Sequence, residues 1–169
     1  MKIELRQYCI EDIPKLAMLA NNYNVSKYLR DIFPYPYLES DATNFINHIT
    51  SLPIERGIEF AITIDNQFVG AIGVTFEQDI YRYTCELGYW LGEPFWNQGI
   101  ITKAIEMLVP YIFENFPIHK ITAEVFSNNI GSQKTLEKNG FILEGTLVEQ
   151  IYKDNQFQDI KIYSLLNSK

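Results

Sequence analysis

The sequence predicts an α/β (α+β) fold, a mixed and mostly antiparallel sheet with helices on both faces. Its 169 residues are the usual size of one domain, and an apolar content of 47% is enough to bury a core. Segments of alternating apolar and polar residues, typical of strands, are interleaved with segments whose apolar residues recur at helical spacing. No linker, repeat or low-complexity tract interrupts this order, so we expect residues 1–169 to form one domain.

The first part of the chain predicts one strand and two helices. Residues 2–8 alternate apolar and polar side chains, as a half-buried strand does, and the residues after Glu11 carry apolar side chains at helical spacing. A short second helix is expected at residues 25–30. An aromatic loop at residues 34–37 should be extended, because proline restricts both itself and the residue before it.

A third helix and three strands follow this loop. Ser40 or Asp41 can cap the helix, which ends near Pro53. The next segments alternate apolar and polar residues and are separated by turns, so they predict an antiparallel meander. Its strands are expected at residues 59–64, 68–76 and 81–91.

The last part of the chain begins with the strongest predicted helix. Residues 98–115 carry apolar side chains at helical spacing, and Pro110 is expected to bend or locally break the helix. A strand, a helix stopped by Gly140 and a final hairpin complete the order. These elements are expected at residues 120–126, at 129–138 and on either side of 153–156.

Charge and composition exclude several classes of function. A net charge of -7 argues against nucleic acid, because phosphate binding needs clustered Lys and Arg, and favours cationic partners. No apolar run approaches the roughly 18 residues of a membrane span, and the N-terminus has no apolar export signal, so we expect a cytoplasmic protein without a membrane partner. Cys9 and Cys85 predict two free buried thiols. A monomer and a homodimer both remain possible.

Neither a metal site nor a nucleophilic triad is predicted. His48 and His119 have no neighbouring Cys, His or acidic residue at the spacing of metal ligands. A Ser-His-Asp arrangement or a Walker-type phosphate loop is equally absent from the sequence. The chemistry must therefore come from other residues.

Residues 93–102 join a predicted strand to the start of the long helix. At such a start, unpaired backbone N–H groups point outward with the positive end of the helix dipole behind them, so the segment can hold a pyrophosphate. Gly99 would let the backbone approach the phosphates closely. A single glycine at such a turn is also common in structural loops, and both interpretations stay open.

Glu86 lies in the middle of a predicted strand and shares its face with Arg82 and Trp90. One interpretation is a solvated sheet face on which Glu86 pairs with Arg82 or with a base on a neighbouring strand. The other makes Glu86 a general base at the floor of a cleft. A protonated amine must lose a proton before it attacks a thioester, and a partly desolvated carboxylate with a raised pKa can accept it.

The last predicted helix opens with residues 129–132. Asn128 or Asn129 can act as a plain N-cap, and a ligand-binding role fits the same spacing. The spacing alone does not decide between them.

Short motifs run in a fixed order along nearly the whole chain. They are Pro34-Tyr35-Pro36-Tyr37, Glu86-Leu87-Gly88-Tyr89-Trp90-Leu91, Phe95-Trp96-Asn97-Gln98-Gly99, Asn129-Ile130-Gly131-Ser132, Leu136-Glu137-Lys138-Asn139-Gly140-Phe141 and Glu144-Gly145. Together they resemble the GNAT superfamily of N-acetyltransferases, specifically its RimJ/RimL-like (ribosomal-protein N-acetyltransferase type) branch.

This resemblance implies a sheet splayed at the strand of residues 81–91, with acetyl-CoA as co-substrate and no metal. The pantetheine arm would pair with the backbone of Tyr89, Trp90 and Leu91. Asn129 and Ser132 match family positions that face CoA near its sulfur. The pyrophosphate would rest on the amides of Asn97, Gln98, Gly99, Ile100, Ile101 and Thr102.

The resemblance also implies a reaction. Glu86 matches the acidic residue often proposed as the base, and the amine would attack the thioester directly while a backbone N–H polarises the carbonyl. Many relatives have a tyrosine as general acid where this chain has Leu136. Ser132 is therefore expected to protonate the leaving thiolate, with Tyr89 as the second choice.

Several positions depart from the family pattern. Asn97 replaces the first glycine of the pyrophosphate loop and Ile101 replaces a small residue, so both add bulk. Where RimL-like enzymes carry an acidic residue this chain has Ile151, and Glu149 could replace it only if the strand is shifted. These departures make a rival function conceivable, a non-catalytic domain of the same fold that binds or senses acyl-CoA.

The leading hypothesis is an acetyltransferase acting on a primary amine. The acceptor would be a small-molecule amine, such as a polyamine or an amino sugar, or a protein N-terminus. One wall of the acceptor site would be formed by Phe33, Tyr35 and Tyr37.

Overall fold

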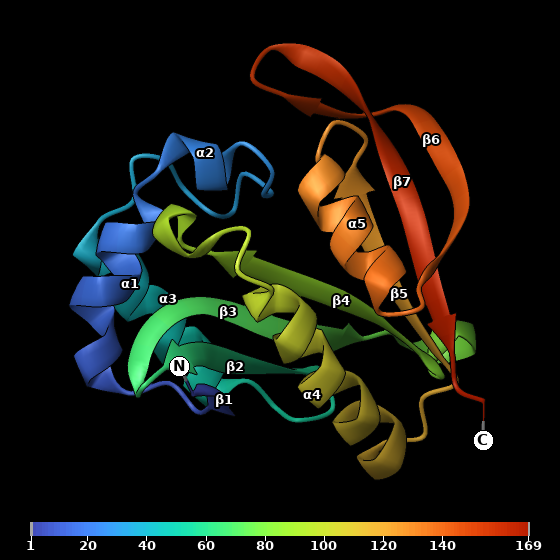
Figure 1. Ribbon diagram of the computed structural model, residues 1–169, viewed down its shortest axis with the longest axis horizontal. Coiled ribbons are helices and arrows are strands. Elements are labelled where there is room, and N and C mark those ends of the chain that lie inside the picture. Colours follow the sequence, from blue (N-terminus) through green and yellow to red (C-terminus); the bar gives the residue numbers. More distant parts are fainter. Residues whose placement is uncertain (1, 169) are drawn as a thin grey trace.

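The computed structural model describes residues 2–168, which form a seven-stranded sheet flanked by helices (Figure 1). The strands are β1 (Ile3–Arg6), β2 (Gly57–Ile64), β3 (Gln67–Phe76), β4 (Thr84–Leu91), β5 (Lys120–Phe126), β6 (Ile142–Lys153) and β7 (Gln156–Leu166). The helices are α1 (Ile13–Ala20), α2 (Tyr23–Ser26), α3 (Glu39–Ser51), α4 (Ile100–Asn115) and α5 (Ile130–Lys138), with the 3-10 turns η1 (Ile10–Asp12), η2 (Asp79–Tyr81) and η3 (Glu93–Phe95). Among these residues, no helix is both long and apolar enough to cross a membrane.

The sheet is mixed and mostly antiparallel, as predicted, with the strand order β1-β2-β3-β4-β5-β7-β6. β3 and β4 stay paired from Cys85 to Leu91, the end of β4. Within residues 2–168, the parallel pairing of β4 with β5 covers only Thr84 to Glu86, while β5 remains paired with β7 along its full length. The sheet therefore opens between β4 and β5 after Glu86, which confirms the expected splay.

Two apolar cores lie on opposite faces of the sheet. On one face Ile105 of α4 and Leu136 of α5 are fully buried, and on the other Leu16 of α1 packs with α3. Because side chains alternate along a strand, neighbouring residues of β2 belong to different cores. Ala61 lies in the core beneath α1, and Ile62 lies in the core beneath α4. Each fully buried Leu or Ile contributes about 1.5–3 kcal/mol, so both helix layers are held firmly against the sheet.

Local backbone geometry shifts the starts of two helices from their predicted positions. α2 begins and ends earlier than predicted, because the Asn22 side chain caps it by accepting a hydrogen bond from the Asn24 N–H. α4 begins later, because Gly99 at its N-cap adopts a left-handed conformation with φ 74°. Pro110 does not break α4, which continues to Asn115.

Two further predicted boundaries are wrong. The N-cap of α3 is Leu38, not Ser40 or Asp41, and the Asp41 carboxylate instead accepts the Leu38 N–H at 2.8 Å. β4 starts later than predicted, at Thr84. The residues before it form η2 and an exposed turn, closed by a hydrogen bond from the Glu77 N–H to the Thr84 carbonyl.

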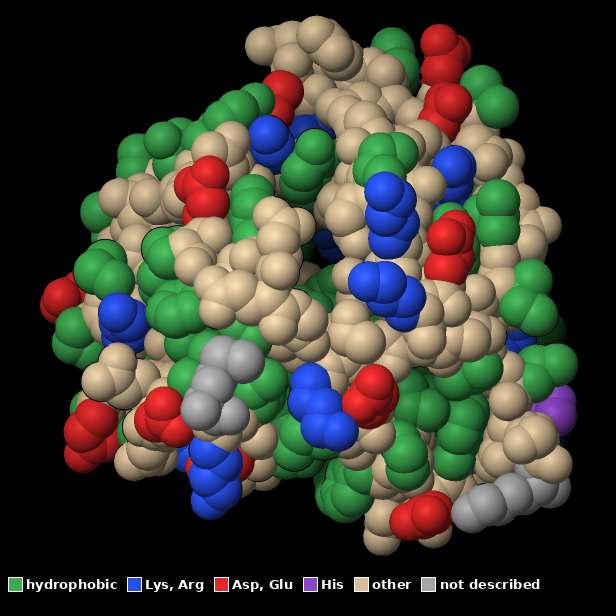
Figure 2. Space-filling model, viewed as in Figure 1, with side chains coloured by type: hydrophobic (Ala, Val, Ile, Leu, Met, Phe, Trp, Pro, Cys, Tyr) green, Lys and Arg blue, Asp and Glu red, His purple; other side chains and the backbone are tan. Residues whose placement is uncertain are grey.

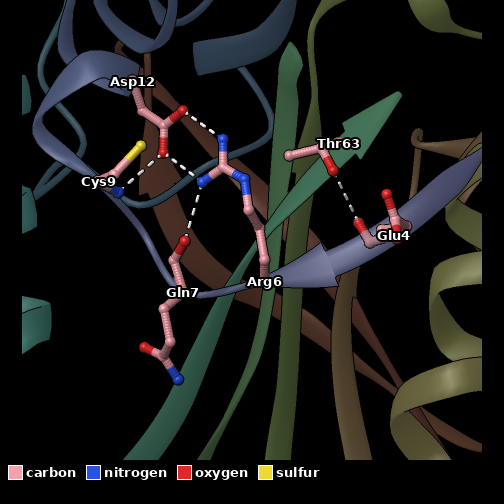
Figure 3. A network of polar contacts seen from close by, with 6 residues as sticks. All are labelled: Glu4, Arg6, Gln7, Cys9, Asp12 and Thr63. Carbon is pink, nitrogen blue, oxygen red and sulfur yellow. Dashed lines mark hydrogen bonds and ion pairs between the residues drawn. The ribbon is translucent and has the colours of Figure 1, made fainter. Parts of the chain in front are cut away.

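A largely buried ion pair ties the end of β1 to the start of α1 (Figure 3). The Arg6 guanidinium donates two hydrogen bonds of 2.7 Å to the Asp12 carboxylate, which also accepts the Cys9 N–H at 3.0 Å. Burial alone raises the pKa of Asp12, but the hydrogen bonds from Arg6 and Cys9 outweigh it and hold the pKa below its usual value. Both cysteines are free. Cys85 is buried as predicted, whereas Cys9 is partly exposed.

Breaking this ion pair should destabilise the fold. Asp12→Asn leaves the Arg6 guanidinium without its counter-ion, and we expect the free energy of unfolding to fall by about 3 kcal/mol in urea titrations. Lys2→Ala is the control, because it removes the Lys2–Glu4 pair, whose side chains are 73% and 42% exposed. Its loss should be below about 1 kcal/mol. Equal losses in the two variants would contradict a structural role for the Arg6–Asp12 pair.

Candidate active site

A hollow lies where β4 and β5 separate. Figure 2 shows it between the N-terminal end of α4 and helix α5. The opposite face of β4 is open as well, because a Cβ atom added at Gly88 would meet no other atom within 4 Å. The separation of the strands thus gives access to β4 from both faces.

The predicted alternation along β4 is confirmed. Cys85 and Leu87 are buried in the core beneath α4, whereas Trp90 packs against the core of α1 and α3. Glu86 and Gly88 share the face of Trp90, since side chains two residues apart point the same way. Glu86 therefore lies at the last position of β4 that pairs with β5, on the face opposite α4.

The backbone of β4 beyond Glu86 has its own polar groups to satisfy. The Gly92 N–H donates to the Val69 carbonyl of β3. Because backbone N–H and C=O groups of successive residues point to opposite edges of a strand, those of Trp90 also point toward β3. Those of Tyr89 and Leu91 consequently point into the gap. The Leu91 carbonyl accepts the indole N–H of Trp96 at 2.7 Å, so this acceptor already has a partner inside the chain.

Glu86 belongs to a cluster of three charged side chains that bridges the two diverging strands. The Arg30 guanidinium, from the loop after α2, lies 2.6 Å from Glu86 Oε1 and 3.4 Å from Glu124 Oε2 of β5. The same nitrogen of Arg30, Nη2, makes both contacts. Glu86 is therefore paired with a base, but not with Arg82, which donates to the Asp79 carbonyl.

The pKa of Glu86 is raised above that of an ordinary glutamate. Burial is the largest cause, and the negative charges of Glu124 and Glu77 act in the same direction. The Arg30 guanidinium opposes them, because it stabilises the charged carboxylate. A carboxylate with a raised pKa beside open space has the properties required of a general base.

Tyr89 and Ser132 meet on the α5 side of the same gap. Their hydroxyl oxygens are 2.8 Å apart, and either can be the donor. Burial raises the pKa of Tyr89 to about 12, although its hydrogen bond with Ser132 acts in the opposite direction. Both hydroxyls are thus protonated at neutral pH, and they form a connected pair of potential proton donors.

The remaining predicted residues of α5 have structural roles in this structure. Asn129 is the N-cap, and its side chain accepts the Ser132 N–H at 3.3 Å, which fits the capping interpretation. Leu136, at the position where many relatives carry a tyrosine, is fully buried in the core. Leu136 therefore offers no proton donor, whereas Ser132 and Tyr89 offer two hydroxyls.

Two residues of the loop before α4 have a left-handed backbone conformation. Asn97 and Gly99 both have left-handed φ angles, 59° and 74°. Asparagine tolerates this region better than other residues with a side chain, so Asn97 preserves a conformation that favours glycine. Gly99 at the N-cap has no side chain to bond the first amides of α4, and a Cβ there would meet nothing within 4 Å. The loop is open toward solvent.

The other residues predicted in this loop divide between surface and core. Gln98 is exposed, and its side chain donates to the Pro94 carbonyl at 3.0 Å. Ile100 is buried, Thr102 is partly buried, and Ile101 packs partly against the core beneath α4. The bulk of Ile101 is thus turned toward the core and away from the exposed loop.

The aromatic residues predicted to line the acceptor site are not all brought together. The Phe33 ring lies 5.4 Å from Trp90 and 4.8 Å from Tyr37. Tyr37 is buried in the core of α1 and α3, where burial raises its pKa to about 12. Tyr35 is exposed and contacts Tyr23 instead. Phe33 and Trp90 are therefore the pair closest to the open face of β4.

Sequence reasoning missed Arg30 and Glu124. Alternation along β5 could have indicated Glu124, because it lies between Ala123 and Val125, which are both buried. Arg30 reaches Glu86 across 56 residues of sequence, and no local pattern signals such a contact.

Solved structures of acetyltransferases share the fold of this chain. RimL, a ribosomal L7/L12 alpha-N-protein acetyltransferase in complex with coenzyme A, superposes with a TM-score of 0.87 at 20% identity, covering 98% of this chain and 94% of that one. The microcin C7 self-immunity acetyltransferase MccE, in complex with acetyl-CoA and AMP, gives a TM-score of 0.87 at 25% identity, covering 98% and 93%.

The family described as "Acetyltransferase (GNAT) domain" matches residues 2–142. The chain therefore belongs to the GNAT acetyltransferase family. Among curated proteins it is similar to the putative ribosomal N-acetyltransferase YdaF of Bacillus subtilis, with 31% identity over 111 residues. That match covers 66% of this chain and 60% of the length of YdaF.

Proposed function

We propose that this protein is an N-acetyltransferase that transfers the acetyl group of acetyl-CoA to a primary amine by direct attack. The observation that carries the proposal is the arrangement around the end of the β4–β5 pairing. A carboxylate with a raised pKa, Glu86, lies on one face of β4, and the hydroxyl pair of Tyr89 and Ser132 lies on the other. Family membership and the complexes of MccE with acetyl-CoA and of RimL with coenzyme A support the choice of co-substrate.

The residues around the gap fit coenzyme A. The exposed loop of Asn97 and Gly99 offers free amides at the positive end of α4, which suits a pyrophosphate. The backbone groups of Tyr89 point into the gap, where an amide-containing arm can pair with them as a further strand would. When bound, the co-substrate supplies an acetyl group activated as a thioester.

Each side of β4 would then handle one proton. Glu86 accepts a proton from the acceptor ammonium, which frees the nitrogen lone pair for attack on the thioester carbonyl. The C–N bond forms and the C–S bond breaks, and Ser132, held by its hydrogen bond to Tyr89, supplies a proton to the departing sulfur. The nitrogen loses its second proton as it becomes an amide, and this proton restores the Ser132 hydroxyl. The overall change converts an ammonium and a thioester into an amide and a thiol, with release of one proton to solvent.

The function is tested with purified protein in two stages. Titration calorimetry with acetyl-CoA measures binding, and release of free thiol is then followed with spermidine, an aminoglycoside and a peptide with an N-terminal serine. Binding with thiol release for one acceptor class supports the enzyme and identifies that class. Binding without turnover on any acceptor supports the rival, a non-catalytic acyl-CoA-binding domain.

Asn97 provides a test of the phosphate cradle. Asn97→Val places a β-branched side chain at a left-handed φ, which costs roughly 1–2 kcal/mol. We expect the Kd of coenzyme A to rise about tenfold in calorimetry. Asn97→Gly is the matched control and should keep the Kd within about twofold, because glycine adopts this conformation freely. Equal affinity of the two variants would show that coenzyme A does not depend on this loop.

Glu86→Gln removes the proposed base while keeping the shape of the side chain. We expect kcat to fall at least about 100-fold near neutral pH, with the Kd of coenzyme A unchanged. The deficit should shrink as the pH approaches the pKa of the acceptor amine, because a neutral amine needs no base. Turnover equal to wild type at neutral pH would rule out this role for Glu86.

Gly88→Ala tests whether the acceptor occupies the open face of β4. The added methyl group would project into free space between Glu86 and Trp90, so we expect the KM of the acceptor to rise about tenfold at unchanged coenzyme A affinity. Gly145→Ala on β6 is the control, since a Cβ there also meets nothing within 4 Å. If both variants keep the wild-type KM, the acceptor binds elsewhere.

A further inference from the structure

The side chain of Arg30 is held beside the proposed base by accessible ion pairs. Its side chain is 67% exposed, and it contacts Glu86 and Glu124, which are 29% and 44% exposed. Ion pairs this accessible add little to stability, about 0–1 kcal/mol, because water screens them. The fold does not require the contact, and a competing cation can displace it at small energetic expense.

The cluster keeps a negative charge even when Arg30 is in place. The charged groups that act on Glu86 are Arg30 from the loop after α2, Glu124 from β5 and Glu77 from the turn after β3. Two carboxylates thus share one guanidinium, and the negative charge of Glu77 acts on Glu86 in addition. An ammonium group entering over Gly88 is attracted to this site and competes with Arg30 for Glu86.

The geometry gives Arg30 a second partner. One nitrogen, Nη2, is 2.6 Å from Glu86 Oε1 and 3.4 Å from Glu124 Oε2, so a small movement transfers its pairing from the first carboxylate to the second. Its loop is also connected to the other wall of the gap. Asp31 accepts a hydrogen bond from Lys153 at 2.7 Å, and the Tyr28 ring contacts Phe126 of β5. Arg30 is therefore kept near both carboxylates.

We propose that Arg30 is a positioning residue for acetyl transfer, which keeps Glu86 ionised in the resting state and moves to Glu124 when the acceptor ammonium takes its place. This inference rests on the proposed function, because it concerns the same base. Without Arg30, burial and two neighbouring carboxylates would keep Glu86 protonated over a wider pH range, and a protonated carboxyl accepts no proton. With Arg30 but without Glu124, the guanidinium would stay on Glu86 and obstruct the acceptor.

Carboxyl 13C NMR of the full chain tests the resting state directly. The Glu86 signal is assigned by its loss in Glu86→Gln, and its titration midpoint is compared in wild type, Arg30→Gln and Arg30→Lys. We expect the midpoint to rise by about one pH unit or more in Arg30→Gln, and by less in Arg30→Lys, which keeps a positive charge. Glu59 is an internal control, because burial raises its pKa to about 8 without a contact to Arg30. An unchanged Glu86 midpoint in folded Arg30→Gln would overturn the proposal.

Kinetics with the fastest acceptor of the functional screen complete the test. In Arg30→Gln the acid limb of kcat/KM should move to higher pH in step with the NMR midpoint, which a purely structural defect would not produce. In Glu124→Gln we expect the acceptor KM to rise several-fold at similar kcat, since Arg30 has lost its second partner. An unaltered acceptor KM in Glu124→Gln would overturn the transfer to Glu124. An NMR midpoint that moves while the rate profile stays fixed would refute Glu86 as the base, and with it any role of Arg30 in the reaction.

Discussion

The separation of β4 from β5 after Glu86 is the constraint on which the rest of the site depends. β5 follows β7 along its full length and β4 stays with β3, whereas the pairing of β4 with β5 ends at Glu86. Each unpaired backbone group near the interior must find another partner or face water, because a buried orphan group costs about 1–3 kcal/mol. One such group, the Leu91 carbonyl, is satisfied by the Trp96 indole. The backbone N–H and C=O groups of Tyr89 face the gap, and they favour a ligand that carries amide groups.

The two faces of β4 differ in the kind of polar group that they present. On the side of the loop after α2, Glu86 is part of a charged cluster that water can reach. On the side of α5, Tyr89 and Ser132 are neutral hydroxyls in a more enclosed setting. This division suits a reaction in which a cation enters from one face and a thioester from the other. A charge beside the apolar acyl arm would be costly to desolvate, whereas a hydroxyl pair is not.

Local sequence patterns predicted most of the fold, because its strands and helices carry clear periodicity. The alternation of β4, which puts Cys85 and Glu86 on opposite faces, was readable from the sequence and held in the structure. Helix starts were less predictable, since they depend on single interactions. In α2 the start depends on the Asn22 cap, and in α3 it depends on the Asp41 carboxylate, which accepts the Leu38 N–H. In both places neighbouring residues are equally plausible caps.

The parts of the candidate site that escaped prediction are joined only in three dimensions. Arg30 meets Glu86 across 56 residues and Glu124 across 94, and Lys153 meets Asp31 across 122. The resemblance to a family indicated Glu86, Ser132 and the aromatic part of the loop after α2, but not Arg30 in the same loop. It also suggested that Asn97 would add bulk to the phosphate loop. The observed φ of 59° shows why asparagine fits there.

The net charge of -7 acquires a specific meaning only at the site. Charges beyond about 8 Å are largely screened at physiological ionic strength, so a distant excess of carboxylates does little to select a ligand. An incoming amine meets the carboxylates of Glu86 and Glu124, which share the single guanidinium of Arg30. The cluster is therefore anionic before the acceptor arrives and close to neutral once an ammonium has joined it. After the proton has been passed on and the neutral amide has formed, that attraction is lost, which favours release of the product.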